Sequence, residues 1–290
     1  MNGSAAGRPA GTAIAWIDGP TLEGTWGDPD RLCLPLSDRG LLLADGLFET
    51  VLVEGGEPRL LAEHLERWRV SAACLGMAPP PGAERVRQLL AEAVARSGLS
   101  GTAALRLNWS RGSGAGRGLA LPGPDEPQGR PRFWLQLSPW TPAATPVAVI
   151  VSGLERRNAD SLVSRCKTFA YTGAIQALRE ARAAGADDAL LLGSGDELSC
   201  ATSANLLVRR QGAWTTPPLA SGCLPGVMRG RGLALGLVRE ERLSVADLQE
   251  SEAALLINSL GGRPIRRCGS TDLPVPAGVA GLWGRLLASS

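Results

Sequence analysis

Lysine is almost absent from this chain of 290 residues, in which Lys167 is the single lysine and the other 29 basic residues are arginines. Arginine replaces lysine wherever only a surface charge is needed, but a guanidinium keeps its proton and cannot form an imine. One explanation for the surviving lysine is chance under a codon bias. The other is amine chemistry, which makes Lys167 a candidate nucleophile.

Histidine and paired cysteines are scarce as well. His64 is the only histidine, and none of the six cysteines belongs to a CxxC pair, which argues against a zinc site and a disulfide framework. Aromatic residues make up only 4% of the chain and the arginines are spread along it. The sequence therefore lacks the stacking platform and basic stripe of a nucleic-acid-binding protein.

Signatures of other protein classes are also missing. No run of about 18 apolar residues occurs, and the opening MNGSAAGRPAGTAIAWIDG has no sustained apolar core, so we expect a cytoplasmic protein without a membrane partner. The Gly-rich stretch at 112–118 lacks the GK[ST] of a P-loop, and no GxSxG of a serine hydrolase is present.

Hydrophobic periodicity predicts an α+β protein. Strands are expected at 48–53, 103–109, 132–137, 147–151, 189–192, 205–208 and 253–257, and helices at 61–75, 84–96, 171–184, 227–235 and 280–287. The Gly- and Pro-rich segment at 111–129 is too long for a simple turn and reads as an active-site flap or as a plain insertion.

The helix expected at 61–75 has an apolar stripe with spacings of three and four residues. Arg67 falls off this stripe, on the polar side with His64 and Ser71. We therefore expect His64 on the helix surface or at a dimer contact.

Six segments resemble, in their order along the chain, the class IV aminotransferases and their lyase relatives, the fold type IV pyridoxal-phosphate enzymes. These segments are DRGLLLADGLFET (38–50), EHLERW (63–68), CKTFAY (166–171), ATSANLLV (201–208), TPPLASGCLPGVMRG (216–230) and INSLGGRPI (257–265). The resemblance implies a two-domain α+β fold like that of D-amino-acid aminotransferase, with a small domain at 1–138, a linker at 139–145 and a large domain at 146–290. It also implies pyridoxal 5'-phosphate between the domains, and a homodimer in which the partner's loop closes the pocket.

Position by position, the resemblance makes Lys167 the Schiff-base lysine and Arg67 a ligand of the cofactor phosphate, a role that suits a planar guanidinium. The segment at 224–229 leads into a helix, so its N–H groups can face an anion. The further cofactor contacts that we expect are Asn205, Gly226, Val227, Met228 and Ser259. Taken alone, Gly226 is also an ordinary helix-start glycine and Ser259 a turn hydroxyl.

The partner of the cofactor's pyridine nitrogen departs from the family pattern. A Glu normally stands five residues before the residue that corresponds to Asn205, and here that position is Cys200. A carboxylate keeps the nitrogen protonated and the ring a strong electron sink, whereas a neutral thiol does this poorly. Three interpretations of this exchange stay open. The enzyme has adapted to the thiol, or the site has degenerated, or Glu197 takes the place of the usual Glu by means of a local bulge.

Within the family, the Gly-Val-Met-Arg and Asn-Ser-Leu stretches and the loop at 111–118 resemble 4-amino-4-deoxychorismate lyases, which release pyruvate and form 4-aminobenzoate for folate synthesis. The loop is one residue longer than the pattern, and Leu119 replaces a common Tyr. Arg111 and Arg117 are the candidates for binding substrate carboxylates, and Thr50 is a pocket candidate that also reads as a plain strand residue. A second partner would be aminodeoxychorismate synthase, which supplies the substrate.

Two alternatives stay open. One is a class IV aminotransferase for branched-chain or D-amino acids, which would share Lys167 and Arg67. The other is a cofactor-binding protein with little catalysis, which the exchange at Cys200 suggests.

Overall fold

The computed structural model describes residues 11–19, 23–113, 118–121 and 129–288, and Arg117 lies outside them. The chain divides into two compact units, Met1–Thr141 and Pro142–Ser290. Both combine helices with β-sheet, as expected for the α+β class. No described helix is long and apolar enough to cross a membrane.

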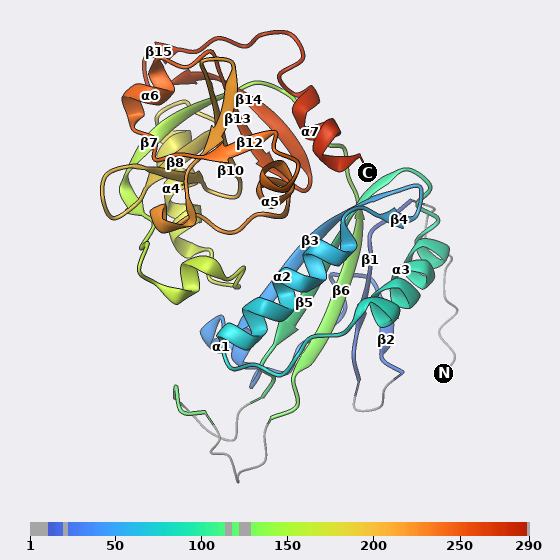
Figure 1. Ribbon diagram of the computed structural model, residues 1–290. Helices are drawn as coiled ribbons and strands as arrows, with labels where there is room; N and C mark the ends of the chain where they lie inside the picture. Colours follow the sequence, from blue (N-terminus) through green and yellow to red (C-terminus); the bar gives the residue numbers. More distant parts are fainter. Residues whose placement is uncertain (1–10, 20–22, 114–117, 122–128, 289–290) are drawn as a thin grey trace. The chain divides into compact units, whose positions relative to one another are not determined.

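The first unit is built on a six-stranded antiparallel sheet in the order β2-β1-β6-β5-β3-β4. Its strands are β1 (Ile14–Ile17), β2 (Thr25–Gly27), β3 (Gly46–Glu54), β4 (Glu57–Pro58), β5 (Thr102–Ser110) and β6 (Arg132–Pro139). Its helices are α1 (Arg39–Leu43), α2 (Leu61–Cys74) and α3 (Ala83–Ser97). In Figure 1, α2 packs along β3, while α3 packs on β1 and β6.

The β3–β4 hairpin turns at Gly55 and Gly56, which have φ angles of 58° and 88°. Backbone in this left-handed region is strained for residues with a side chain, so two consecutive glycines permit the turn. Inside the unit, the Trp68 ring of α2 packs on Phe133 of β6, with ring centroids 5.9 Å apart.

The prediction that the polar side of α2 faces solvent is wrong. His64 and Ser71 are 1% and 3% exposed, so this polar side of the helix is buried. This side of the helix is buried because it faces a polar group on the sheet. Glu49 of β3 is fully buried and forms a hydrogen bond with His64. A polar side chain can face inward when a buried partner satisfies it.

The second unit is built on a nine-stranded mixed sheet in the order β12-β11-β10-β13-β14-β7-β8-β9, with β15 beside β14. Its strands are β7 (Val147–Arg156), β8 (Asp188–Leu192), β9 (Leu198–Ala201), β10 (Asn205–Arg210), β11 (Ala213–Thr216), β12 (Val238–Glu240), β13 (Ala253–Asn258), β14 (Gly261–Cys268) and β15 (Thr271–Asp272). Because β9 also pairs with β10, the strands from β10 through β13, β14, β7 and β8 to β9 close into a ring.

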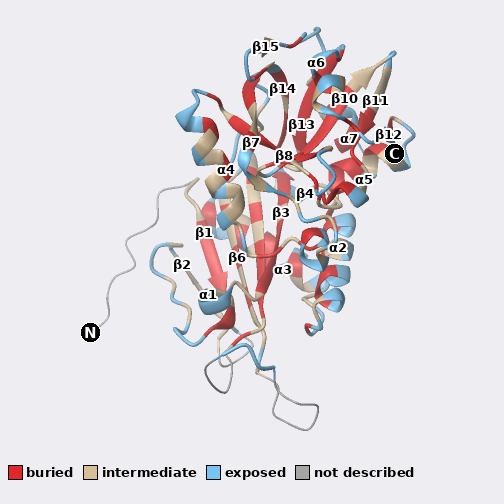
Figure 2. Ribbon diagram, turned by 90° about the vertical axis from the view of Figure 1, so that its left-hand side faces the viewer, coloured by how far each residue is buried: buried red, intermediate tan, exposed pale blue. Residues whose placement is uncertain are grey.

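The helices of the second unit are α4 (Thr172–Ala183), α5 (Val227–Ala234), α6 (Val245–Gln249) and α7 (Gly281–Leu287), with short 3-10 turns η1 (Leu162–Arg165) and η2 (Leu219–Ser221). Figure 2 shows the strands as largely buried and the helices as exposed along one side, the pattern expected for helices that cover a sheet. The helices predicted at 84–96, 171–184, 227–235 and 280–287 correspond to α3, α4, α5 and α7.

A bulge in β9 separates two apolar clusters. Leu191 lies opposite Cys200 but the next residue, Leu192, lies opposite Leu198, so Ser199 is the extra residue. As a result, Leu198 packs in the cluster around Leu190 and Leu206, whereas Cys200 packs with the alanines of α4.

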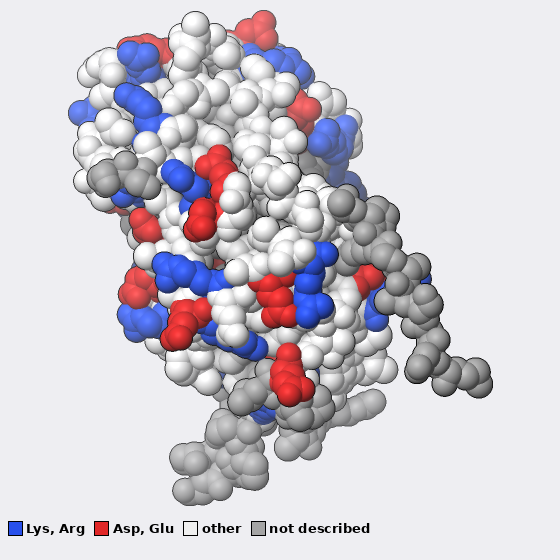
Figure 3. Space-filling model, turned by 90° about the vertical axis from the view of Figure 1, so that its right-hand side faces the viewer, with Lys and Arg blue, Asp and Glu red and all other residues white. Residues whose placement is uncertain are grey.

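Charged side chains of both signs are interspersed on the face shown in Figure 3. Among the described residues, charged side chains of opposite sign also pair, as Arg210 does with Asp247 and Arg209 with Glu252. That face therefore carries no continuous stripe of one sign.

Candidate active site

The single lysine lies in the loop between η1 and α4. Lys167 Nζ donates a hydrogen bond of 3.0 Å to Tyr171 Oη, and the neighbouring Cys166 and Thr168 are buried. The buried neighbours fix the backbone on both sides, while the hydroxyl holds the amine. Tyr171 was missed as a site residue, although the only tyrosine stands four positions after the only lysine.

Arg157 ties the lysine loop to the segment that leads into α5. Its Nε donates to the carbonyl oxygen of Gly222 and its Nη2 to that of Ser164, both at 2.9 Å. These bonds join the residues just before Lys167 to the loop just before α5. The sequence did not indicate this role of Arg157. Its partners are backbone carbonyls, which every residue has, so no sequence pattern marks them.

The start of α5 is a candidate site for an anion. Gly226 is the N-cap residue, and no described side chain caps the helix, so the N–H groups of Val227 and Met228 face outward from the helix end. A Cβ on Gly226 would lie 1.9 Å from Oδ1 of Asn205. Asn205 Nδ2 in turn donates to the carbonyl of Leu224 at 2.9 Å. The structure therefore brings together Asn205, Gly226, Val227 and Met228.

Ser259 lies in the turn between β13 and β14. The neighbouring Asn258 fastens this turn, since its Nδ2 donates to the Ser203 carbonyl at 3.2 Å and its Oδ1 accepts from the Leu260 amide at 2.9 Å. Ser203 belongs to the short loop that joins β9 to β10. The Ser259 turn is thereby attached to the loop that precedes Asn205.

Cys200 occupies the position opposite Asn205 and is 7% exposed. Burial raises the pKa of its thiol, and the charge of Arg157 lowers it only in part. The group is therefore a neutral thiol near pH 7 rather than a thiolate.

Glu197 is held elsewhere, beyond the bulge. A Cβ on Gly195 would lie 2.6 Å from Glu197 Oε2, and Oε1 accepts a hydrogen bond of 3.3 Å from Arg242. Its carboxylate thus lies over the turn between β8 and β9. The residue that faces Asn205 is Cys200 and not Glu197.

In the first unit, Glu49, His64 and Arg67 form one buried cluster. Arg67 binds the carboxylate bidentately, with Nε 2.8 Å from Oε1 and Nη2 2.5 Å from Oε2 of Glu49. His64 Nδ1 lies 2.7 Å from Oε2 of the same group. Burial alone would raise the pKa of Glu49, but the charge of Arg67 and the bonds from both partners outweigh it and lower the pKa to about 2.

Thr50, the next residue of β3, alternates to the opposite side of the strand from Glu49. It is half-buried and lies across from Arg106 of β5. The structure therefore does not group Thr50 with Arg67.

Arg111 anchors the end of α2. Its Nη1 and Nη2 donate to the carbonyls of Gly76 and Leu75 at 2.8 and 2.9 Å, and its Nε donates to Asp45 at 2.9 Å. Asp45 also accepts from Arg39 at 2.8 Å; burial would raise its pKa, but the two arginines lower it. The guanidinium of Arg111 is thus engaged by three groups of its own chain.

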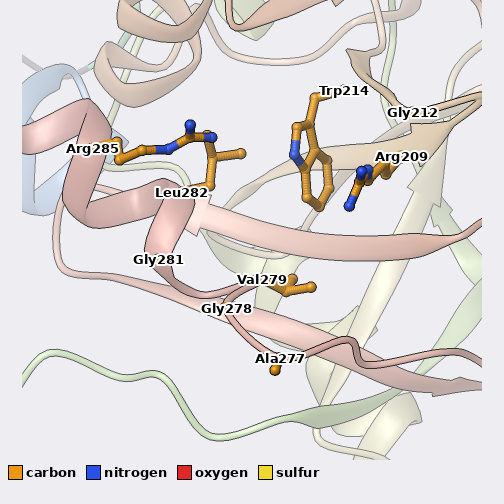
Figure 4. Close-up of a pocket in the computed structure, with 9 residues that line it drawn as sticks. All are labelled: Arg209, Gly212, Trp214, Ala277, Gly278, Val279, Gly281, Leu282 and Arg285. Atoms are coloured by element: carbon orange, nitrogen blue, oxygen red, sulfur yellow. The ribbon is translucent and has the colours of Figure 1, made fainter.

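A cavity of about 380 Å³ in the second unit has Arg209, Trp214 and Arg285 in its wall (Figure 4). None of the predicted site residues lines it. Over the described part of the chain, no cluster of His, Cys, Asp or Glu is placed to hold a metal ion.

Comparisons with known proteins agree on the family and the fold. The family model described as amino-transferase class IV matches residues 46–268. A candidate aminodeoxychorismate lyase from Schizosaccharomyces pombe is 30% identical over 222 residues, 73% of this chain and 85% of that protein. A candidate branched-chain-amino-acid aminotransferase from Methanocaldococcus jannaschii is 27% identical over 230 residues, 78% of this chain and 76% of that protein.

Among solved structures, the fold IV transaminase CpuTA1 from Curtobacterium pusillum matches with a TM-score of 0.82 at 24% identity, over 96% of this chain and 100% of that chain. At this identity the likeness concerns the fold alone. It confirms the expected fold type IV architecture.

Proposed function

Since this chain belongs to the class IV aminotransferase family, whose enzymes use pyridoxal 5'-phosphate, we propose that it is a 4-amino-4-deoxychorismate lyase dependent on that cofactor. It would eliminate pyruvate from aminodeoxychorismate and release 4-aminobenzoate for folate synthesis. The similarity to a candidate lyase over most of the chain supports this choice.

The residues present fit the cofactor. Lys167, held by Tyr171, would carry it covalently, and the uncapped start of α5 would bind its phosphate through the amides of Val227 and Met228. Because Gly226 has no Cβ, the side chain of Asn205 can lie close to the start of this helix. The proposed contacts also include Arg67, Asn205, Cys200 and Ser259. When bound, the cofactor would supply an electron sink for charge at the carbon next to the substrate nitrogen.

The chain's own residues would handle the proton. Lys167 Nζ would remove the proton from the carbon that bears the nitrogen and return a proton to the departing enolpyruvate. The Tyr171 hydroxyl, 3.0 Å from Nζ, would keep the amine in place during both transfers. Arg117 would bind a substrate carboxylate, and the engaged Arg111 would do so only in exchange for one of its present partners.

The observation that carries the choice of a lyase is the neutral thiol of Cys200 opposite Asn205. A neutral thiol offers no negative charge to hold a proton on the cofactor's ring nitrogen, so the electron sink would be weak. Elimination of pyruvate creates an aromatic ring, a driving force that lowers the demand on the sink. Transamination has no such assistance.

Borohydride reduction combined with a product assay tests the proposal. We expect a visible absorption band that reduction removes, a mass adduct on Lys167, and 4-aminobenzoate from enzymatically generated aminodeoxychorismate. Because Lys167 is the only lysine in the sequence, it is the only side chain that can carry the lysine adduct. Absence of the band and adduct would refute the cofactor assignment itself.

A class IV aminotransferase is the second candidate, supported by the match to the Methanocaldococcus jannaschii protein. It would form the same Lys167 adduct but transfer an amino group from a branched-chain or D-amino acid to a keto acid. An adduct with neither activity would instead indicate a cofactor-binding protein with little catalysis.

We also propose a cytoplasmic homodimer that receives its substrate from aminodeoxychorismate synthase. Exposed leucines at α1 and beside it support self-association, since Leu36, Leu42 and Leu119 are 82%, 63% and 80% exposed. Arg39 joins these regions through bonds to the carbonyls of Gly118, Leu119 and Ala120. Light scattering should give twice the chain mass, and Leu42→Glu should reduce it towards that of one chain.

A further inference from the structure

We propose that Glu49 and His64 are positioning residues that fix the guanidinium plane of Arg67 for phosphate recognition. This inference rests on the proposed function, in which Arg67 binds the cofactor phosphate. Neither Glu49 nor His64 would touch the phosphate. Each would act through Arg67.

Hydrogen bonds link three side chains from two secondary-structure elements, β3 and α2. Glu49 of β3 holds Arg67 of α2 by Nε and Nη2, and two parallel bonds fix the plane of a guanidinium where one bond would let it turn. His64, one helical turn before Arg67, bonds to Oε2 at 2.7 Å and so limits rotation of the carboxylate. The exposed fractions of the Glu49, His64 and Arg67 side chains are 0%, 1% and 11%.

Stability does not by itself explain why charged groups rather than apolar side chains occupy this place. Taking a carboxylate and a guanidinium out of water costs free energy that their attraction often fails to recover, and apolar replacements of such pairs are frequently neutral or stabilising. A carboxylate beside an arginine also weakens the attraction of that arginine for an anion. Fixed orientation is a benefit that offsets both costs at a phosphate site.

The tautomer of His64 follows from the same contacts. Because the pKa of Glu49 is about 2, its carboxylate is ionised at neutral pH and can only accept hydrogen bonds. His64 Nδ1 must therefore donate. This is the only imidazole in the chain, so its nitrogen resonances need no assignment among other histidines.

Glu49→Gln separates orientation from charge, because the two effects have opposite signs. If charge were the whole effect, removal of a negative group beside Arg67 would strengthen binding of pyridoxal 5'-phosphate. If Glu49 positions Arg67, the dissociation constant should rise about tenfold, as expected for loss of hydrogen bonds to a charged group. Binding is read from titration of the cofactor-free protein and from the ³¹P resonance of the bound phosphate.

Glu66→Gln is the matched control. Glu66 lies on the same helix and pairs with Arg69 through Oε1 and Oε2, but both side chains are 59% exposed. The same chemical change there should leave the dissociation constant unchanged.

His64 provides a second test that does not disturb the carboxylate. His64→Asn keeps a short N–H donor and should retain most of the affinity, whereas His64→Leu removes the donor and should weaken binding. In ¹⁵N-histidine-labelled protein, the nitrogen shifts should show a proton on Nδ1, and this signal should change in Glu49→Gln.

The outcomes distinguish the two proposals. Unchanged or tighter binding by a folded Glu49→Gln protein, with normal binding and a Lys167 adduct in the unaltered protein, overturns the positioning role alone. If Glu49→Gln does not fold, equal affinities of His64→Asn and His64→Leu overturn it. No cofactor binding by the unaltered protein overturns the proposed function and this inference together.

Discussion

Cys200 and Asn205 lie directly opposite each other, in the pairing that joins β9 to β10 and closes the ring of strands in the second unit. Asn205 reaches from this pairing to the Leu224 carbonyl and to the space beside Gly226. Cys200 lies among the alanines that pack under α4. The ring closure thus places the Cys200 thiol and the Asn205 amide opposite each other, with Asn205 next to the start of α5.

Cys200→Glu should preserve lyase activity within about tenfold, a change of about 1.4 kcal/mol in the barrier. Arg157 lies close enough to lower the pKa of a group at this position, so it would help to keep the new carboxylate ionised. We expect transamination to increase, because the ring nitrogen would then have an anionic partner. The measurements are 4-aminobenzoate formation, amino transfer to a keto acid and cofactor occupancy.

A fully loaded but inactive Cys200→Glu protein would contradict the adaptation of this site to lyase chemistry. Loss of cofactor together with a lower unfolding temperature would instead show that the core beneath α4 does not accommodate the larger side chain.

Gly226→Ala should destabilise the protein by about 1–3 kcal/mol, the typical cost of inserting a methyl group into occupied space. The new Cβ would meet Asn205 Oδ1 at 1.9 Å, and movement of Asn205 would break its bond to Leu224. Chemical denaturation measures the loss. Cofactor affinity should fall with it.

Gly230→Ala on the same helix is the control, since nothing lies within 4 Å of its Cβ position. Alanine is favoured over glycine inside a helix by about 1 kcal/mol, so this variant should be slightly more stable than the unaltered protein. Equal losses in both variants would show that the Gly226 position is not specially constrained.

The regular elements could be predicted because they carry long periodic patterns. The stripes of α3 and α4 and the apolar alternation of β5 extend over many residues, and each was located from sequence alone. Short or irregular strands could not be predicted from the sequence pattern. In β14, the sequence GGRPIRRC combines glycine, proline and arginine and offers no alternation, and only its neighbours in the sheet make it a strand.

The candidate site also contains residues that could be predicted from the sequence and residues that could not. Lys167 could be singled out by composition, whereas Arg157 could not, because its role lies in carbonyl oxygens of Ser164 and Gly222 that the fold brings near. His64 was misplaced for a related reason. The pattern of one helix gives its polar side, but only the partner strand shows that Glu49 lies beneath that side.

Acid should selectively remove the stability that Glu49 provides. Its pKa falls from the usual 4.5 to about 2 in the folded protein, which corresponds to on the order of 3 kcal/mol. Because the folded pKa is the lower one, this contribution is present above pH 4.5 and is lost as the pH falls towards 2.

Denaturant unfolding at several pH values from 7 to 3 checks this expectation. The gap in unfolding free energy between the unaltered protein and Glu49→Gln should narrow as the pH falls through this window. Parallel profiles of the two proteins would show that the pKa of Glu49 is not lowered by folding.

Tyr171→Phe should slow the proposed lyase reaction about tenfold while leaving the Lys167 adduct intact. The change removes the hydroxyl that accepts a hydrogen bond from Nζ at 3.0 Å, but it keeps the ring, whose centroid lies 5.5 Å from Nζ. A single hydrogen bond of this kind contributes about 0.5–1.5 kcal/mol, which sets the size of the effect. Because the bond holds the amine that would carry the proton, the loss should appear in the turnover rate of the loaded enzyme and not in the amount of cofactor bound. Single-turnover formation of 4-aminobenzoate, compared at equal adduct levels, makes that distinction. A variant with full rate would place the hydroxyl outside the proton path, and one without adduct would assign it to cofactor attachment instead.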